Sequence, residues 1–158
     1  MALTGELMEA AKKQGLKIHI NPSPCDEKIE KLPLELADVF FVNEIEGIAL
    51  AHVQVDTPYP VVVDTLVKRF PKSEILLTAG KDGAYYGYGE IRERGTIMDV
   101  PVVDTVGAGD TFTGYYIAAR CRNYPVAEAL EIACKAASIA VSRKGAMEAM
   151  PFASEVFG

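Results

Sequence analysis

Short apolar segments rich in β-branched and aromatic residues alternate with segments of helical periodicity along this chain of 158 residues. The periodicity predicts strands at residues 16–20, 38–42, 73–78 and 96–100, and helices at 4–14, 44–51, 61–70, 111–121 and 126–142. Residues 84–88 and 91–94 predict a β-hairpin, and a last short helix is expected after Phe152. This alternation predicts an α/β layered fold with a mostly parallel sheet and one antiparallel hairpin.

The length and the composition exclude several classes of protein. A chain of 158 residues suggests one domain, 1–158, with a sizeable core. Its 49% hydrophobic and 24% charged residues are ordinary for a soluble globular protein. The net charge of −6 argues against nucleic-acid binding, and no apolar run reaches the roughly 20 residues of a membrane span. We therefore expect neither nucleic acid nor a membrane as a partner.

The cysteines and histidines carry little chemistry of their own. Cys25, Cys121 and Cys134 are odd in number and share no Cys-x-x-Cys spacing, which is typical of reduced thiols. The start of the chain lacks the basic and apolar regions of a signal peptide, so we expect a cytoplasmic protein. His19 and His52 are isolated, and a metal site built on paired histidines is not expected.

The stretch Val103–Phe112 carries the most distinctive pattern. An apolar, strand-like approach leads into Gly107-Ala108-Gly109, then Asp110, then the predicted helix. The two glycines allow a turn whose N–H groups point one way at a helix N-terminus, which is a suitable anion hole for a phosphate. Asp110 could simply cap the helix. Alternatively, the amides hold a phosphoryl group during transfer and Asp110 accepts the proton of the attacking hydroxyl.

Other polar and glycine residues also follow predicted strands. Asn43 ends one strand and can cap the next helix, and Thr78 with Gly80 ends another. Because ligands of parallel sheets bind beyond the carboxyl ends of the strands, we expect these residues and Gly107–Asp110 to form one site. The sequence contains no P-loop, no third glycine for a dinucleotide-binding fingerprint and no protein-kinase motifs.

Several of these motifs together resemble a known family. Asp104-Thr-Val-Gly-Ala-Gly-Asp110 is similar to the C-terminal signature of the ribokinase-like (PfkB) carbohydrate kinases, and Asn43-Glu-Ile-Glu46 resembles their Asn-x-x-Glu motif. The segments 21–24, 78–83 and 140–146 also match, in the same order and at similar separations. The resemblance covers essentially the whole chain, but only the C-terminal half of a family member. It implies a three-layer αβα, Rossmann-like sheet.

The resemblance implies ATP-dependent phosphorylation of a sugar hydroxyl. Asp110 matches the catalytic base, and Gly107, Ala108 and Gly109 match the anion hole. Asn43 matches a residue close to the nucleotide phosphates, and Thr78, Gly80 and Gly83 match the nucleotide-binding turn. For Gly83 an ordinary turn is the alternative.

The resemblance also implies two kinds of cation. Glu46 matches the residue that organises Mg²⁺ through water, although by itself it could be a solvated helix charge. A set of positions matches the K⁺ site of many members, which uses mainly backbone carbonyls: Asp104, Val106, Ala140, Arg143 and Gly145. Ala149 stands where ribokinases commonly have a serine ligand, and Arg143 with Lys144 could instead be a solvated basic turn.

The sugar-binding and lid-bearing N-terminal half of the family has no counterpart in this sequence. We therefore expect an incomplete enzyme when the chain is alone, with the missing half or a second copy of the chain as its partner. The alternatives are a non-catalytic nucleotide-binding module, or a kinase of the same family that acts on a nucleoside, a keto-deoxy acid or a hydroxymethylpyrimidine.

Overall fold

The computed structural model describes residues 2–157, and their contacts divide the chain into two units. The first unit contains the chain up to Ala79 together with Tyr85–Arg92. The second contains Gly80–Ala84 together with the chain from Glu93 onward. Each unit is described by itself below.

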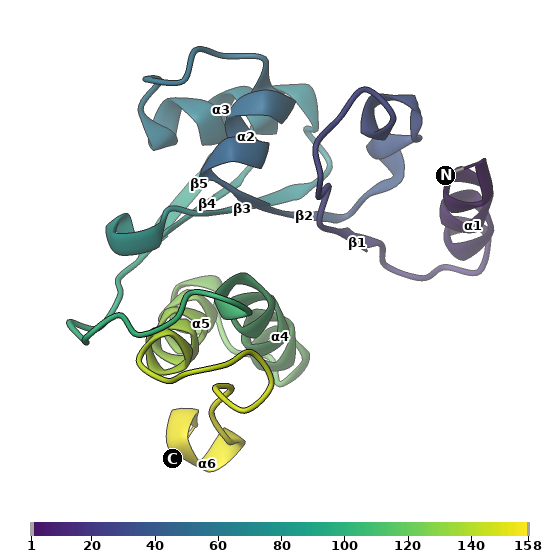
Figure 1. Cartoon of the computed structure of the whole chain (residues 1–158). Helices are drawn as coiled ribbons and strands as arrows, with labels where there is room; N and C mark the ends of the chain where they lie inside the picture. The colour runs from purple at the N-terminus through teal and green to yellow at the C-terminus, as the bar shows by residue number, and fades with distance from the viewer. Residues whose placement is uncertain (1, 158) are drawn as a thin grey trace. The chain divides into compact units, whose positions relative to one another are not determined.

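A five-stranded sheet provides the framework (Figure 1). Its strands follow one another in the order β1-β2-β3-β4-β5: β1 (His19–Ile20), β2 (Val39–Asn43), β3 (Glu74–Thr78), β4 (Ala84–Tyr88) and β5 (Ile91–Gly95). Strands β1, β2 and β3 are parallel, whereas β4 and β5 are joined as a hairpin by a two-residue loop. The sheet is therefore mixed, and the predicted α/β fold with one hairpin is confirmed.

The first unit packs its helices on the central strands. It contains α1 (Ala2–Lys13), α2 (Glu44–Ala51) and α3 (Tyr59–Arg69), with the 3₁₀ turns η1 (Ile29–Lys31) and η2 (Leu34–Leu36). Its core consists of apolar side chains that β2, β3, α2 and α3 bury completely, among them Phe40, Leu50, Val62, Leu66, Ile75 and Leu77. This apolar packing fixes the strand ends that carry Asn43 and Thr78.

The second unit is built on a helix pair. It contains the 3₁₀ turn η3 (Gly80–Asp82), α4 (Ala108–Cys121), α5 (Val126–Val141) and the short α6 (Ala153–Val156). Small side chains such as Ala119, Ala129 and Ala133 are fully buried, which lets α4 and α5 pack closely. No helix within residues 2–157 combines the length and the hydropathy that a bilayer span requires.

Three small residues lie against one another beside β5. A Cβ on Gly83, which has a φ of +84°, would come within 2.2 Å of the Gly95 carbonyl oxygen. A Cβ on Gly95 would in turn come within 2.8 Å of the Cys134 Sγ on α5. Burial raises the pKa of the Cys134 thiol to about 12. The close approach of backbone to backbone and to α5 therefore accounts for both glycines.

Two strand predictions are wrong: one strand is shorter than predicted, and the other is not formed. The segment 16–20 forms only the two residues of β1, because the Asp38 carboxylate accepts the Ile18 amide at 2.6 Å in place of a strand partner. The segment 96–100 forms no strand in the described chain. There the Thr96 amide donates to Glu131 at 3.2 Å and the Met98 amide donates to the Ser138 hydroxyl at 3.0 Å. In both places side chains replace ladder carbonyls as acceptors.

Candidate functional site

A reciprocal cap links Asn43 and Glu46 at the start of α2. The Asn43 side-chain oxygen accepts the Glu46 amide at 2.9 Å, and the Glu46 carboxylate accepts the Asn43 amide at 3.0 Å. This capping box satisfies donors that a helix N-terminus otherwise leaves open. Glu46 is 6% exposed, so its interpretation as a solvated helix charge is wrong. Asn43 caps the helix as the sequence predicts.

Thr78 lies beside Asn43 at the carboxyl edge of the sheet. The two residues are register partners on β3 and β2, as expected for parallel strands that end together. The Thr78 hydroxyl makes only a long, 3.4 Å contact to the Val42 carbonyl. Both strand ends therefore present polar groups at one edge, where α/β sheets commonly bind ligands.

The residues near Glu46 fit Mg²⁺ held through water better than a direct metal cage. Its buried carboxylate uses one oxygen, Oε2, in the cap. Within residues 2–157 there is no group of three or more His, Cys, Asp or Glu that could hold a metal ion. Because Mg²⁺ keeps several water ligands and takes few carboxylates, a single buried carboxylate is compatible with it.

The N-terminus of α4 has no side-chain cap. Gly107 is the N-cap residue and has a φ of +78°, a left-handed conformation that glycine adopts without strain. Its carbonyl accepts both the amide and the hydroxyl of Thr111 at 2.9 Å. Among the described residues no acceptor faces the amides of Gly109 and Asp110. These donors remain available to an anion.

Asp110 lies in the first turn of α4, three positions after Gly107, and is exposed. It is not the N-cap residue, so its interpretation as a simple helix cap is wrong. The helix starts at Ala108 rather than at Thr111, and no strand leads into it. The physical reason is that the segment before Gly107 bonds to α5 instead of to a strand: the amides of Val103 and Asp104 both donate to the Val141 carbonyl.

Gly109 lies in open space. A Cβ added to it would meet no heavy atom within 4 Å, and its helical backbone does not need a positive φ. Glycine in a helix costs roughly 0.5–1 kcal/mol relative to alanine. Neither packing nor backbone conformation within the chain explains why this position lacks a side chain.

Three of the predicted K⁺-site residues lie together. The Asp104 carboxylate accepts the Val106 amide at 3.0 Å with one oxygen and the Gly145 amide at 3.1 Å with the other. These two hydrogen bonds lower the pKa of the Asp104 carboxyl. The Ala140 carbonyl accepts the Arg143 amide at 3.1 Å. Ala149 is completely buried.

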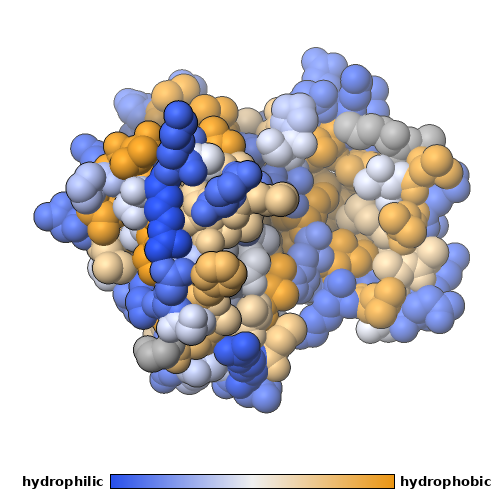
Figure 2. All heavy atoms as spheres, turned by 60° about the horizontal axis from the view of Figure 1, so that its bottom comes forward, coloured by the Kyte–Doolittle hydropathy of each residue, from blue (hydrophilic) through white to orange (hydrophobic). Residues whose placement is uncertain are grey.

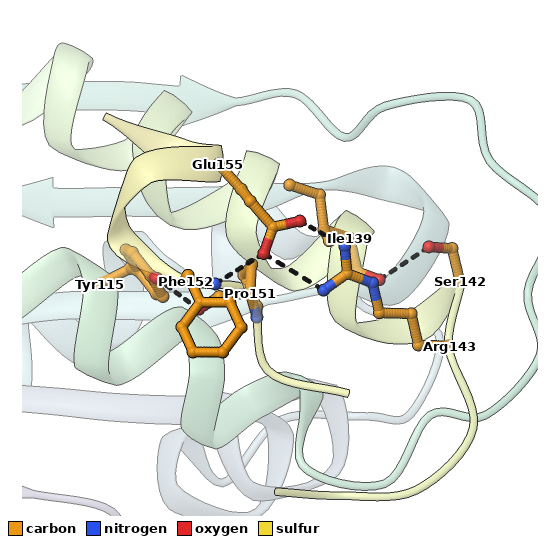
Figure 3. A network of polar contacts seen from close by, with 7 residues as sticks. All are labelled: Tyr115, Ile139, Ser142, Arg143, Pro151, Phe152 and Glu155. Carbon is orange, nitrogen blue, oxygen red and sulfur yellow. Dashed lines mark hydrogen bonds and ion pairs between the residues drawn. The ribbon is translucent and has the colours of Figure 1, made fainter. Parts of the chain in front are cut away.

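Arg143 forms an ion pair that the sequence did not predict (Figure 3). Its guanidinium donates to the Glu155 carboxylate on α6, at 2.5 Å from Nη2, which raises the pKa of the guanidinium and lowers that of the carboxyl. The Arg143 side chain is therefore not simply solvated. The signal in the sequence is the position of Glu155, three residues after Phe152, the N-cap residue of α6.

Gly80 and Gly83 form a turn of the second unit. Both have positive φ values, +47° and +84°, and the Gly83 amide donates to the Gly80 carbonyl at 3.2 Å. The contact with Gly95 gives Gly83 a structural reason of its own. A nucleotide-binding role for these two glycines stays a prediction.

Comparison with known proteins identifies the family. The model of the pfkB family carbohydrate kinases matches residues 2–153. The chain belongs to the pfkB family. Ribokinase from Haemophilus influenzae is 30% identical over 151 residues, which are 93% of this chain and 48% of that protein. The chain spans about half the length of the curated relatives it matches.

Solved structures of the family agree with this assignment. Arabidopsis thaliana ribokinase, complexed with ribose and ATP, is 27% identical with a TM-score of 0.83, and the match covers 98% of this chain and 51% of that one. A candidate ribokinase II from E. coli, in complex with ATP and Mg²⁺, is 26% identical with a TM-score of 0.80, covering 95% and 50%. The ribokinase-like fold is thereby confirmed.

Proposed function

We propose that this chain is the ATP-binding and phosphoryl-transfer part of an ATP-dependent sugar kinase. One observation supports the proposal: the exposed carboxylate of Asp110 lies in the first turn of α4, next to amides that donate to no acceptor within residues 2–157. A helix that only needed stabilising would gain from a capping side chain in place of Gly107. Open amides together with a nearby base suit phosphoryl transfer.

Each residue then has a defined task. The amides of Gly109 and Asp110, with Gly107 and Ala108 shaping the turn, stabilise negative charge on the phosphoryl group. The Asp110 carboxylate accepts the proton of the attacking hydroxyl. Because phosphoryl transfer has a loose transition state, this base mainly positions the hydroxyl. Mg²⁺, when bound, would neutralise phosphate charge, and Glu46 is the residue that would hold its water shell. Asn43, Thr78, Gly80 and Gly83 would contact the nucleotide.

The proposed acceptor is the hydroxyl of a pentose such as ribose. The Haemophilus influenzae relative is a ribokinase, and the Arabidopsis ribokinase structure contains ribose together with ATP. A deoxyribokinase from Salmonella typhi is also similar, at 28% identity. For the K⁺ site we propose Asp104, Val106, Ala140, Arg143 and Gly145, supported by the contacts that join Asp104 to Val106 and Gly145.

The decisive experiment is the substitution Asp110→Asn. It removes the base but keeps the shape, so ATP·Mg²⁺ affinity, measured by calorimetry on the purified chain, should change by less than about twofold. Turnover should fall by about 10²-fold or more, because general-base catalysis contributes roughly that factor. Turnover would be measured by ADP release with ribose, for the chain alone and for a chimera in which it replaces the matching half of the Haemophilus relative.

The exposed Asp99 provides a matched control. Asp99→Asn changes the net charge by the same amount, lies outside α4, and should leave both quantities unchanged. Turnover that survives Asp110→Asn would show that Asp110 is not the base.

A nucleotide-binding module without catalysis is the second candidate. The observation that favours it is the open N-terminus of α4, whose free amides can bind a phosphate without any base. ATP·Mg²⁺ binding without turnover, in the chain and in a well-folded chimera, would support it.

A further inference from the structure

The C-terminal segment of the second unit is attached to both long helices. The Tyr115 hydroxyl of α4 donates to the Pro151 carbonyl at 2.7 Å (Figure 3), and the Lys135 ammonium of α5 donates to the Val156 carbonyl at 3.0 Å. The Phe157 ring packs against Tyr115 and under the guanidinium of Arg122. None of these contacts involves Glu155, the acidic residue of α6, so the helix is held in place independently of that side chain.

The Glu155 carboxylate of α6 makes a further connection. Its Oε2 accepts the Phe152 amide at 2.8 Å, and both of its oxygens accept N–H groups of Arg143, as the dashed lines in Figure 3 show. The Nη2–Oε1 contact is short, at 2.5 Å, and the Nη1–Oε2 contact is longer, at 3.4 Å, and together they restrict the orientation of the guanidinium. Since α6 is already attached elsewhere, the main effect of this pair is on Arg143 and the turn that it begins.

That turn supports the segment before α4. Two residues after Arg143, the Gly145 amide donates to Asp104, whose other oxygen accepts the Val106 amide. At the next position, the Cα and Cβ of Ala146 lie 3.5 and 3.6 Å from where a Cβ of Gly107 would be. The turn therefore contacts the chain on both sides of Val106, immediately before the open amides of α4.

We propose that Glu155 is a positioning residue for the α4 N-terminus, acting through Arg143 and the turn at 143–146. The inference rests on the proposed function, because it names the residue that holds the anion-binding amides in place. Glu155 does not touch the nucleotide or the sugar in this account. It restricts the turn against which Gly107 packs, and thereby reduces the reorganisation that anion binding requires.

The test compares Glu155→Gln with Glu128→Gln in the purified chain. Glutamine at 155 can still accept the Phe152 amide but no longer carries the charge that orients Arg143. Glu128 is an exposed acidic residue of α5, so its substitution changes the net charge equally. We expect Glu155→Gln to raise the dissociation constant for ATP·Mg²⁺ about three- to fivefold, the effect of a partly exposed ion pair. Glu128→Gln should leave that constant unchanged.

A second readout is independent of nucleotide binding. In the free chain, the amide NMR signals of Gly107 and Gly145 should shift in Glu155→Gln and not in Glu128→Gln. A merely structural role of Glu155 would lower thermal stability without selectively moving these two signals. In a double-mutant cycle, Arg143→Gln and Glu155→Gln together should weaken binding no more than either change alone, because the two side chains act as one unit.

The outcomes separate the two proposals. If the wild-type chain does not bind ATP·Mg²⁺, the proposed function fails, while the glycine signals still decide whether Glu155 positions the turn. If Glu155→Gln matches Glu128→Gln in affinity and in both glycine signals, the positioning role is wrong. Additive losses in the double-mutant cycle would also contradict it.

Discussion

The N-termini of α2 and α4 solve the same problem in opposite ways. At α2, the side chains of Asn43 and Glu46 exchange hydrogen bonds with each other's backbone, and Glu46 is buried. At α4, Gly107 offers no side chain, and the amides of Gly109 and Asp110 face no acceptor within the described chain. Both helices begin with polar motifs in the sequence, but only one of them is satisfied internally.

This difference separates a structural helix start from a ligand-binding one. Each unsatisfied donor at a helix N-terminus must find a side chain, water or a ligand. The α2 cap fixes the side chains of Asn43 and Glu46, and leaves the Asn43 side-chain nitrogen and the second carboxylate oxygen of Glu46 outside the cap. The α4 turn instead keeps its positive end free, at some cost in stability. Stability and anion binding should therefore respond differently to substitutions at the two sites.

The largest expected effect comes from removing the α2 cap. Asn43→Ala should lower the free energy of unfolding by about 2 kcal/mol, because a capping side chain is worth about that at most and the Glu46 amide loses its acceptor. Urea denaturation measures this loss. Asn43→Ser retains an oxygen acceptor and should cost less than about 0.5 kcal/mol. If the alanine variant is as stable as the wild type, the α2 cap does not stabilise the protein, and the N-termini of α2 and α4 do not differ in the way described above.

The second prediction concerns the open site at α4. Gly109→Ala should weaken ATP·Mg²⁺ binding about tenfold, or about 1.4 kcal/mol, because the new methyl group occupies space next to the free amides. The same change should raise stability by up to about 1 kcal/mol, since helical glycine is unfavourable.

Gly114 is the control for this substitution. It lies further along α4, and a Cβ there also meets nothing within 4 Å. Gly114→Ala should give the gain in stability without any loss of affinity. An equal loss of affinity in the two variants would mean that the first turn of α4 is not the anion site.

The smallest expected effect separates the two tasks of Glu46. Glu46→Gln keeps an oxygen that can accept the Asn43 amide, and glutamine also occurs at this position of capping boxes. Stability should therefore change by less than about 0.5 kcal/mol. The Mg²⁺ dependence of ATP binding should weaken by about threefold, because a charge that acts on the metal only through water contributes less than about 1 kcal/mol. Calorimetry at several Mg²⁺ concentrations measures this dependence. If Glu46→Gln leaves it unchanged, Glu46 serves only in the helix cap and not in Mg²⁺ binding.

The features that the sequence predicts well are local ones. Asn43 followed by Glu46 specifies its own cap, since both partners lie within one helical turn. The pairing of Asn43 with Thr78 also follows, because parallel strands end at the same edge. In the candidate site, the motif spacing indicates Gly107 and Asp110 and, through the resemblance, their family. These predictions need no knowledge of distant contacts.

Several of the failures involve partners far along the chain. Thr96 and Met98 have strand-like neighbours, but their amides donate to Glu131 and Ser138, which lie 35 and 40 residues away. The role of Asp38 in shortening β1 depends on tertiary placement in the same way. Glu155 was missed because its partner, Arg143, is twelve residues earlier and in a different element. Local propensity contains no information on such acceptors.

The stack of Gly83, Gly95 and Cys134 restricts the order in which this region can evolve. An alanine at position 95 would put its methyl group within 2.8 Å of the Cys134 sulfur, whereas an alanine at position 134 would remove that sulfur. Replacement of Cys134 by a smaller residue must therefore come before any enlargement of Gly95, and the Leu130 Cβ and carbonyl oxygen, 3.2 and 3.3 Å from the same methyl position, must also shift slightly. Gly83 has no such route, because its obstacle is the Gly95 backbone carbonyl, which every amino acid carries. Of these residues, Gly95 can be replaced only after Cys134 has changed, whereas Gly83 cannot be replaced at all without moving the backbone.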